Sequence, residues 1–200
     1  ILAHGWNSTC FQIVNPGIER WWSRDQEVLV GYVVSGRMAV VAGAPVCALE
    51  RLASGIVEWE DFAASQGWTV CYFGAEERLC AVLEEAGGYA QVVLGCQPEW
   101  HPSEFLRSLR TTPTLRAQLN RARNKGVRVM EVGVGNGPVR SEVESVLEDW
   151  LAHRGLPTLR FLVEPHILED LEGRRLFVAH RESEVVGFVT LSRVPARKGW

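Results

Sequence analysis

The segment from Phe105 to Met130 concentrates positive charge in a chain that is otherwise acidic. It contains no acidic residue, and its basic residues are Arg107, Arg110, Arg116, Arg121, Arg123, Lys125 and Arg128. The whole chain has 21 basic and 24 acidic residues, so outside this segment 14 basic residues face 24 acidic ones, a net charge of −10. Guanidinium and ammonium groups gathered in this way suit a localised anionic partner. The charge therefore predicts contact with the phosphates of RNA, of a lipid surface or of a cofactor.

The spacing within this segment predicts an amphipathic helix. Leu115, Leu119 and Ala122 recur at i, i+4 and i+7 and form an apolar stripe. Polar side chains cover the remaining surface, and the candidate substrate-binding residues among them are Arg116, Asn120, Arg121, Arg123 and Lys125. Two interpretations stay open for this cationic face: a solvated surface, or a phosphate-binding one. Basic residues without acidic neighbours at i,i+4 cannot form the usual ion pairs within a helix. Their presence therefore favours the phosphate-binding interpretation as much as the solvated one.

The cysteines and histidines do not indicate a metal site. The five cysteines are scattered and form no C-x-x-C pair, and the five histidines show no paired spacing. We therefore expect no metal, and reduced thiols in a cytoplasmic setting. The longest weakly polar run, "MAVVAGAPVCAL", is shorter than the roughly 20 residues of a membrane span. Because the sequence starts at Ile1, we expect it to be part of a longer protein, and upstream membrane segments remain open.

The elements that carry these residues form two series joined near residues 97–105. The first series reads ββ-α-β-α-β, and its expected elements are a hairpin over 27–43 turning at Ser35 and Gly36, helices over 49–66 and 75–87, and strands over 68–73 and 89–95. The second reads α-β-α-ββ, and its elements are the basic helix, a strand over 127–132, a helix over 141–153 and a hairpin over 174–194. Ser141 and Glu144 have the spacing of a capping box. The order predicts an α/β protein with mixed sheets, divided into residues 1–104 and 105–200.

Several stretches together resemble one known family. The stretches are "LRAQLNRARNKGVRVMEV", "LEDWLAHRGLP", "FLVEP", "LFVAHRESEVVGFVTLSRVPARKGW" and "AVVAGAPVC". In order and spacing they are similar to the catalytic region of the phosphatidylglycerol lysyltransferase type (DUF2156), from Phe11 onward. The resemblance implies two tandem halves that are each like a GNAT N-acetyltransferase, the first a structural copy and the second incomplete at its C-terminal end.

The resemblance also implies an activity: transfer of an aminoacyl group from charged tRNA to a phosphatidylglycerol-like head group. The donor would be aminoacyl-tRNA, and no separate cofactor would be needed. The reaction would take place at the inner face of the plasma membrane. In many members of the family a membrane domain precedes the catalytic region. Because an aminoacyl ester is already activated, transfer needs orientation, a proton acceptor and oxyanion stabilisation, but no covalent nucleophile.

Glu164 in "FLVEP" is the candidate acid/base or substrate-amine residue, and its alternative role is a carboxylate near the start of a helix. Further basic residues near the end of the last hairpin would extend the cationic patch, namely Arg193, Arg197 and Lys198.

Two other functions remain open. A CoA-dependent N-acetyltransferase would need a [QR]-x-x-G-x-[GA] loop for pyrophosphate, and "VVAGAPVCALERL" lacks it. A non-catalytic module that binds tRNA or membrane would need only the basic surface.

Overall fold

The computed structural model describes residues 1–133, 137–153, 168 and 173–200, and it resolves into two compact units. The first unit comprises residues 1–92 together with 154–174 and 191–200, and the second comprises 93–153 and 175–190. Each unit has its own sheet, so the expectation of an α/β protein with two sheets is confirmed. The division at residues 104 and 105, and the likeness of each half to a GNAT fold, stay predictions.

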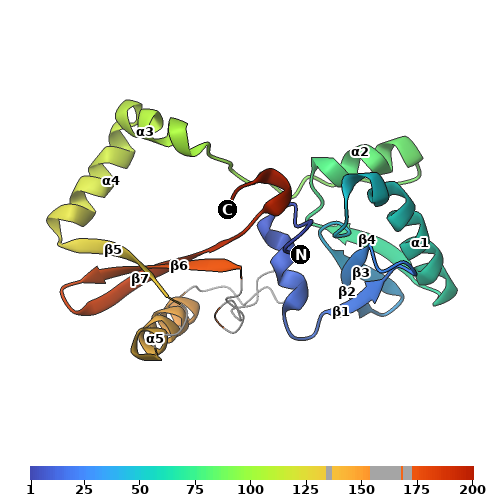
Figure 1. The fold of residues 1–200 in the computed structure, drawn as a ribbon, viewed down its shortest axis with the longest axis horizontal. Coiled ribbons are helices and arrows are strands. Elements are labelled where there is room, and N and C mark those ends of the chain that lie inside the picture. The colour runs from blue at the N-terminus through green and yellow to red at the C-terminus, as the bar shows by residue number, and fades with distance from the viewer. Residues whose placement is uncertain (134–136, 154–167, 169–172) are drawn as a thin grey trace. The chain divides into compact units, whose positions relative to one another are not determined.

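A four-stranded mixed sheet forms the centre of the first unit (Figure 1). Its strands are β1 (Glu19–Trp22), β2 (Leu29–Ser35), β3 (Met38–Ala42) and β4 (Thr69–Phe73), in the order β1-β2-β3-β4. The first three are antiparallel and β4 is parallel to β3. The predicted hairpin is confirmed: Ser35 pairs with Met38 across a turn whose Gly36 has φ +60°. Glycine adopts this conformation without steric cost.

The alternation of side chains along β2 buries both faces of this sheet. Val30 and Tyr32 point to one face, where they join a core with α1 (Leu52–Ser65) and α2 (Glu77–Ala86). Leu29 belongs to the other face, which the 3-10 helix η1 (Ser8–Val14) covers. Since successive strand residues point in opposite directions, a strand buried on both sides needs this nearly continuous apolar run.

Trp59 of α1 is the largest side chain in the core of the first unit and is fully buried. Its ring lies 4.7 Å from that of Tyr32, 5.6 Å from Trp21 and 5.8 Å from Phe62, measured between centroids. Tilted and edge-on ring pairs at such distances add about 0.5–1.5 kcal/mol beyond their buried area. The helix predicted over 49–66 begins with a short 3-10 turn, η2 (Leu49–Arg51), and packs on the sheet through these aromatic rings together with Leu52, Ile56 and Ala63.

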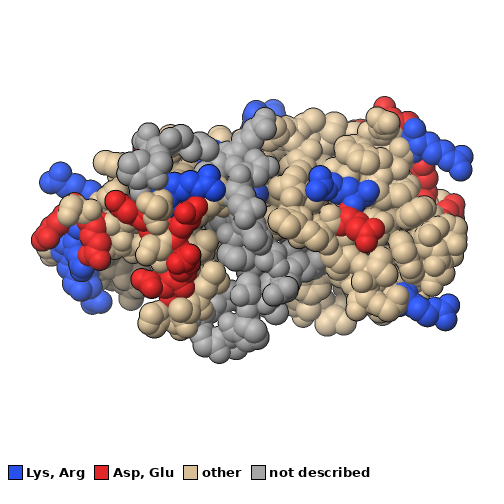
Figure 2. All heavy atoms as spheres, turned by 90° about the horizontal axis from the view of Figure 1, so that it is seen from below, with Lys and Arg blue, Asp and Glu red and all other residues tan. Residues whose placement is uncertain are grey.

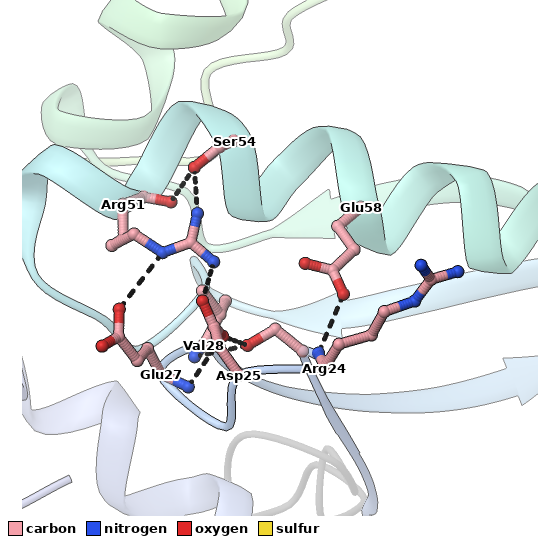
Figure 3. A network of polar contacts seen from close by, with 8 residues as sticks. Arg24, Asp25, Glu27, Val28, Arg51, Ser54 and Glu58 are labelled. Atoms are coloured by element: carbon pink, nitrogen blue, oxygen red, sulfur yellow. Dashed lines mark hydrogen bonds and ion pairs between the residues drawn. The ribbon is translucent and has the colours of Figure 1, made fainter.

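Arg51 holds the loop between β1 and β2 against the start of α1 (Figure 3). Its guanidinium lies 2.5 Å from a carboxylate oxygen of Asp25 and 3.3 Å from one of Glu27, and it also donates to the Ser54 hydroxyl. Asp25 in turn accepts hydrogen bonds from the Ser23 hydroxyl and the Glu27 backbone N–H. These bonds to the charged form lower the pKa of Asp25 below its ordinary 3.8, with the Ser23 bond the largest cause.

The second unit combines three helices with a three-stranded sheet. The helices are α3 (Pro102–Thr111), α4 (Pro113–Asn124) and α5 (Gly137–His153). The strands are β5 (Val127–Val132), β6 (Arg174–Arg181) and β7 (Glu184–Ser192), in the order β5-β6-β7. β5 and β6 are antiparallel, with Val127 opposite Arg181 and Val132 opposite Leu176. A last 3-10 turn, η4 (Pro195–Arg197), lies in the first unit.

Two local predictions were wrong, and the predicted joint holds the start of an additional helix. Residues 89–95 form no strand, and Val92 and Val93 are 78% and 85% exposed, because β propensity yields a strand only where a neighbour supplies hydrogen bonds. The joint predicted over 97–105 contains the start of α3 at Pro102, a residue well suited to a first helical position. Ser141 does not cap a helix, since α5 begins at Gly137, and Glu144 pairs with Arg140 instead.

Within the described residues, no helix has both the length and the apolar character that crossing a bilayer requires.

Replacing Gly31 in β2 by alanine should destabilise the first unit. An added Cβ would meet the Ile13 side chain, with its Cβ 2.6 Å away, and Ile13 is almost fully buried, so it has no room to move. Overpacking of this kind costs about 1–3 kcal/mol. Urea unfolding measures the loss, and Gly187→Ala in β7, where an added Cβ meets nothing within 4 Å, is the control. Equal effects of the two substitutions would contradict the packing described.

Asp25→Ala should lower the thermal midpoint at neutral pH by an amount that shrinks in acid. A carboxylate whose pKa is lowered by folding stabilises the protein above its unfolded pKa, and the effect is lost as pH falls through the folded pKa. The difference in midpoint between parent and variant should thus be full above pH 3.8 and decline below it. A difference that stays constant down to the acid limit would show that charge is not its cause.

Candidate functional site

The basic segment forms a corner of two helices, and proline fixes where the corner lies. Pro113 begins α4, and the preceding Thr112 has the extended conformation φ −108°, ψ 97°. A residue before proline is driven away from helical geometry, so α3 ends at Thr111 instead of continuing into α4. Arg116 donates to the backbone carbonyl of Arg110 at the end of α3. One of the candidate phosphate-binding residues therefore also helps to close the corner.

The two faces of α4 agree with the predicted periodicity. Leu115, Leu119 and Ala122 are half-buried and form its least exposed side. All the candidate binding residues on this segment are exposed, namely Arg116, Asn120, Arg121, Arg123 and Lys125. Their accessibility is what a phosphate contact requires, while the contact itself stays a prediction.

Part of this charge also has a purely structural explanation. Arg121 and Arg123 lie in the last turn of α4, and Lys125 is its C-cap residue. Cations near a helix C-terminus interact favourably with the helix dipole, typically by about 0.3–1 kcal/mol each at an exposed position. Arg110 has the same position in α3. Both interpretations of the cationic face, helix stabilisation and anion binding, therefore need an experiment to separate them.

Three acidic side chains of the second unit pair with arginines outside α3 and α4. Glu131 of β5 forms a two-point contact with Arg175, with both N–O distances 2.6 Å. The Arg175 hydrogen bond lowers the pKa of Glu131. The other pairs join Arg140 to Glu144 at 2.8 Å and Arg181 to Glu184 at 3.3 Å. In the part of the chain that the structure describes, no ion pair involves a basic residue of α3 or α4, so their charge is not neutralised there.

Acidic side chains gather instead on α5. The face shown in Figure 2 carries a group of red Asp and Glu atoms where α5 lies. The acidic residues of this helix are Glu142, Glu144, Glu148 and Asp149. The second unit thus separates its charges by helix, negative on α5 and positive on α3 and α4. A ligand that carries negative charge would be attracted to one of these helical surfaces and repelled by the other.

The remaining basic candidates belong to the first unit. Arg193 and Lys198 are exposed, and Arg197 lies 2.9 Å from a carboxylate oxygen of Glu76. Arg197 also stacks over the Trp6 ring, 4.7 Å from its centroid. The pair is strengthened because Glu76 accepts a second hydrogen bond, from Asn7. Whether these three cations extend the α4 surface stays a prediction.

The Trp6 cluster was not foreseen in the sequence. Besides Arg197, the guanidinium of Arg78 lies 5.1 Å from the Trp6 ring centroid and donates to the Cys47 carbonyl. These residues are far apart along the chain and show no common spacing, so no local sequence pattern predicts their contact. Trp6 and Arg78 line a small hollow with Asn7 and Cys10.

The remaining expectations concern a catalytic carboxylate and a metal site. Glu164 lies outside the described residues, so its acid/base role stays a prediction. Among the residues that the structure describes, no group of His, Cys, Asp and Glu is arranged to hold a metal ion.

The family model for the C-terminal region of phosphatidylglycerol lysyltransferase matches residues 2–200. No curated protein matches the sequence.

Two solved structures share the fold. One is the C-terminal domain (DUF2156) of a protein described as a lysylphosphatidylglycerol synthetase from Agrobacterium fabrum, with TM-score 0.70 and 19% identity, covering 96% of this chain and 61% of that one. The other is L-PGS from Bacillus licheniformis, with TM-score 0.66 and 18% identity, covering 89% of this chain and 55% of that one. The present chain therefore spans less than two thirds of either solved chain.

Neutralising two cations of α4 should weaken tRNA binding and reduce its salt dependence. The variant Arg121→Gln/Arg123→Gln leaves Arg116, which closes the helix corner, in place. For every phosphate that the variant no longer touches, the slope of log affinity against log salt should fall by about one. The matched control is Arg20→Gln/Arg37→Gln, which removes the same charge from exposed positions of the first unit. Filter binding across a salt series gives both quantities. Indistinguishable slopes would favour the helix-dipole explanation.

Proposed function

This chain belongs to the phosphatidylglycerol lysyltransferase C-terminal family, and on that premise we propose that it transfers an aminoacyl group from charged tRNA to a phosphatidylglycerol-like lipid. The reaction would take place at the cytoplasmic surface of the membrane. The observation that carries the proposal is the family match over residues 2–200.

The charge of the second unit supports tRNA as the donor. The exposed cations of α4 have no acidic partner within the described residues. A nucleic acid supplies a row of phosphates, so several cations on one helix can each be matched. Phosphate contacts position a nucleic acid without reading its sequence. α4 would thus hold tRNA of any acceptor type, and the amino acid would be selected elsewhere.

The chemistry is an exchange of one ester for another. A hydroxyl oxygen of the lipid head group attacks the aminoacyl carbonyl carbon and forms a C–O bond. The C–O bond to the terminal ribose of the tRNA then breaks, and the proton of the lipid hydroxyl ends on the ribose oxygen. The protein must hold both substrates close, accept and return that proton, and stabilise the developing oxyanion. Glu164 is our candidate for the proton transfer.

The acetyltransferase alternative is not favoured by the turn after β3. Pyrophosphate in such a site is bound by free backbone N–H groups at a helix start. Here the N–H of Gly43 donates to the Phe73 carbonyl at 2.8 Å, and that of Val46 donates to the Leu29 carbonyl at 2.8 Å. These donors are already used within the protein. Two amides of this turn are therefore not free to bind a pyrophosphate.

Labelled aminoacyl groups should move from charged tRNA into lipid when the full-length protein is mixed with a panel of charged tRNAs and phosphatidylglycerol vesicles. RNase should abolish the transfer, because it destroys the donor, and added CoA should leave it unchanged. Scintillation counting of the extracted lipid measures the product. Arg121→Gln/Arg123→Gln should slow transfer at low tRNA concentration more than the control Arg20→Gln/Arg37→Gln does.

Two results would decide against the proposal. Label that moves only from acetyl-CoA would establish the N-acetyltransferase. Binding of tRNA with no transfer from any charged species would leave a non-catalytic binding module.

A further inference from the structure

α3 presents an apolar surface to solvent. None of its residues is buried, and the exposed fractions are 39% for Phe105 and 62% for Leu106. Trp100, just before the helix, is 69% exposed. Single exposed apolar residues are ordinary, but several large ones within about seven positions form a patch that needs an explanation.

The apolar residues of α3 lie on one side of the helix. At about 100° per residue, Phe105, Leu109, Pro102 and Leu106 fall within an arc of about 100°. Glu104, the acidic residue of this helix, falls on the opposite side. This is the amphipathic arrangement of a helix that lies on an apolar medium.

One basic side chain borders the apolar arc. By the same geometry Arg110 lies about 40° beyond Leu106, whereas Arg107 lies about 60° further round, on the side away from the arc, as Glu104 does. Both are exposed, and neither forms an ion pair with a described residue. A long arginine side chain can lay its methylene groups along an apolar surface and keep its guanidinium in water. Trp100, exposed just before the helix, also suits a boundary between water and hydrocarbon, because tryptophan joins a large apolar ring to one N–H donor.

We propose that α3 docks on an anionic lipid bilayer, with Trp100, Phe105 and Leu106 entering the interface and Arg110 contacting lipid phosphates. The choice of an anionic bilayer rests on the proposed function, in which the acceptor is an anionic lipid. A protein groove would also accept an apolar helix face, but Arg110 beside the arc and the exposed cations of the following helix α4 favour a surface of uniform negative charge. α3 would then bring the protein to its acceptor, while α4 binds the donor.

The first test is sedimentation of the 200-residue chain with vesicles. Binding should be stronger to vesicles of phosphatidylglycerol and phosphatidylcholine than to phosphatidylcholine alone, and it should weaken as salt increases. Leu106→Ser should reduce partitioning by about tenfold or more, because it removes most of a buried aliphatic side chain. Leu49→Ser is the matched control, since Leu49 is 58% exposed and lies in η2 of the first unit. Circular dichroism checks that both variants fold.

The second test locates Trp100. Brominated lipids should quench part of the tryptophan emission, and Trp100→Phe should remove that quenched part. Arg110→Gln should reduce binding to the anionic vesicles and flatten its salt dependence.

The inference fails if Leu106→Ser and Leu49→Ser bind vesicles alike, or if the quenched emission survives Trp100→Phe. It also fails if Leu106→Ser instead converts a dimer to a monomer in size-exclusion chromatography, since a second copy would then cover the apolar arc. The proposed function is judged separately. Transfer to phosphatidylglycerol dissolved in detergent micelles should survive Leu106→Ser, whereas absence of transfer from the parent protein would contradict the function and leave the vesicle result standing.

Discussion

The placement of ion pairs in the second unit decides which of its cations remain open to a ligand. Glu131 is held by two hydrogen bonds from Arg175 across neighbouring strands, and Glu144 is held by Arg140 within one helix. A carboxylate fixed in this way cannot reach α3 or α4. Surface pairs of this kind contribute little stability, with a median near about 0–1 kcal/mol. Their larger effect is on the electrostatic field around the unit, because they leave the cations of α3 and α4 without an ion-pair partner among the described residues.

The sequence predicts those elements whose signals are local. The turn at Gly36 and the half-buried stripe of α4 follow from residue type and spacing, and both are present. The strand expected over 89–95 shows the limit of this reasoning, since β-branched residues favour a strand only where another strand accepts and donates their hydrogen bonds. The start of α5 was misplaced for a related reason: Ser141 and Glu144 have the spacing of a capping box, but the helix had already begun at Gly137.

The candidate site also combines features that the sequence predicts with features that it does not. Exposure of the α4 cations could be inferred from periodicity, because a helix with one apolar stripe must turn its other residues to water. The additional role of Arg116 at the helix corner, and the contact of Arg197 with Glu76, depend on chain segments that meet only in the folded protein. Residue spacing cannot predict contacts between segments so far apart along the chain. The family resemblance supplied the reaction type, which neither charge nor periodicity contains.

The contact between Arg197 and Glu76 joins residues 121 positions apart, and the N–H of Ala196 donates to the Gly5 carbonyl at 3.1 Å. The second unit consists of two segments, 93–153 and 175–190, and each lies between segments of the first unit in the sequence. A ribosome makes the chain from its N-terminus, so the ring of Trp6 and the carboxylate of Glu76 are finished long before Arg197 emerges to meet them. During that interval the nascent first unit exposes an aromatic surface and an incompletely paired carboxylate. Apolar surface that is exposed in this way during synthesis favours wrong association of a growing chain.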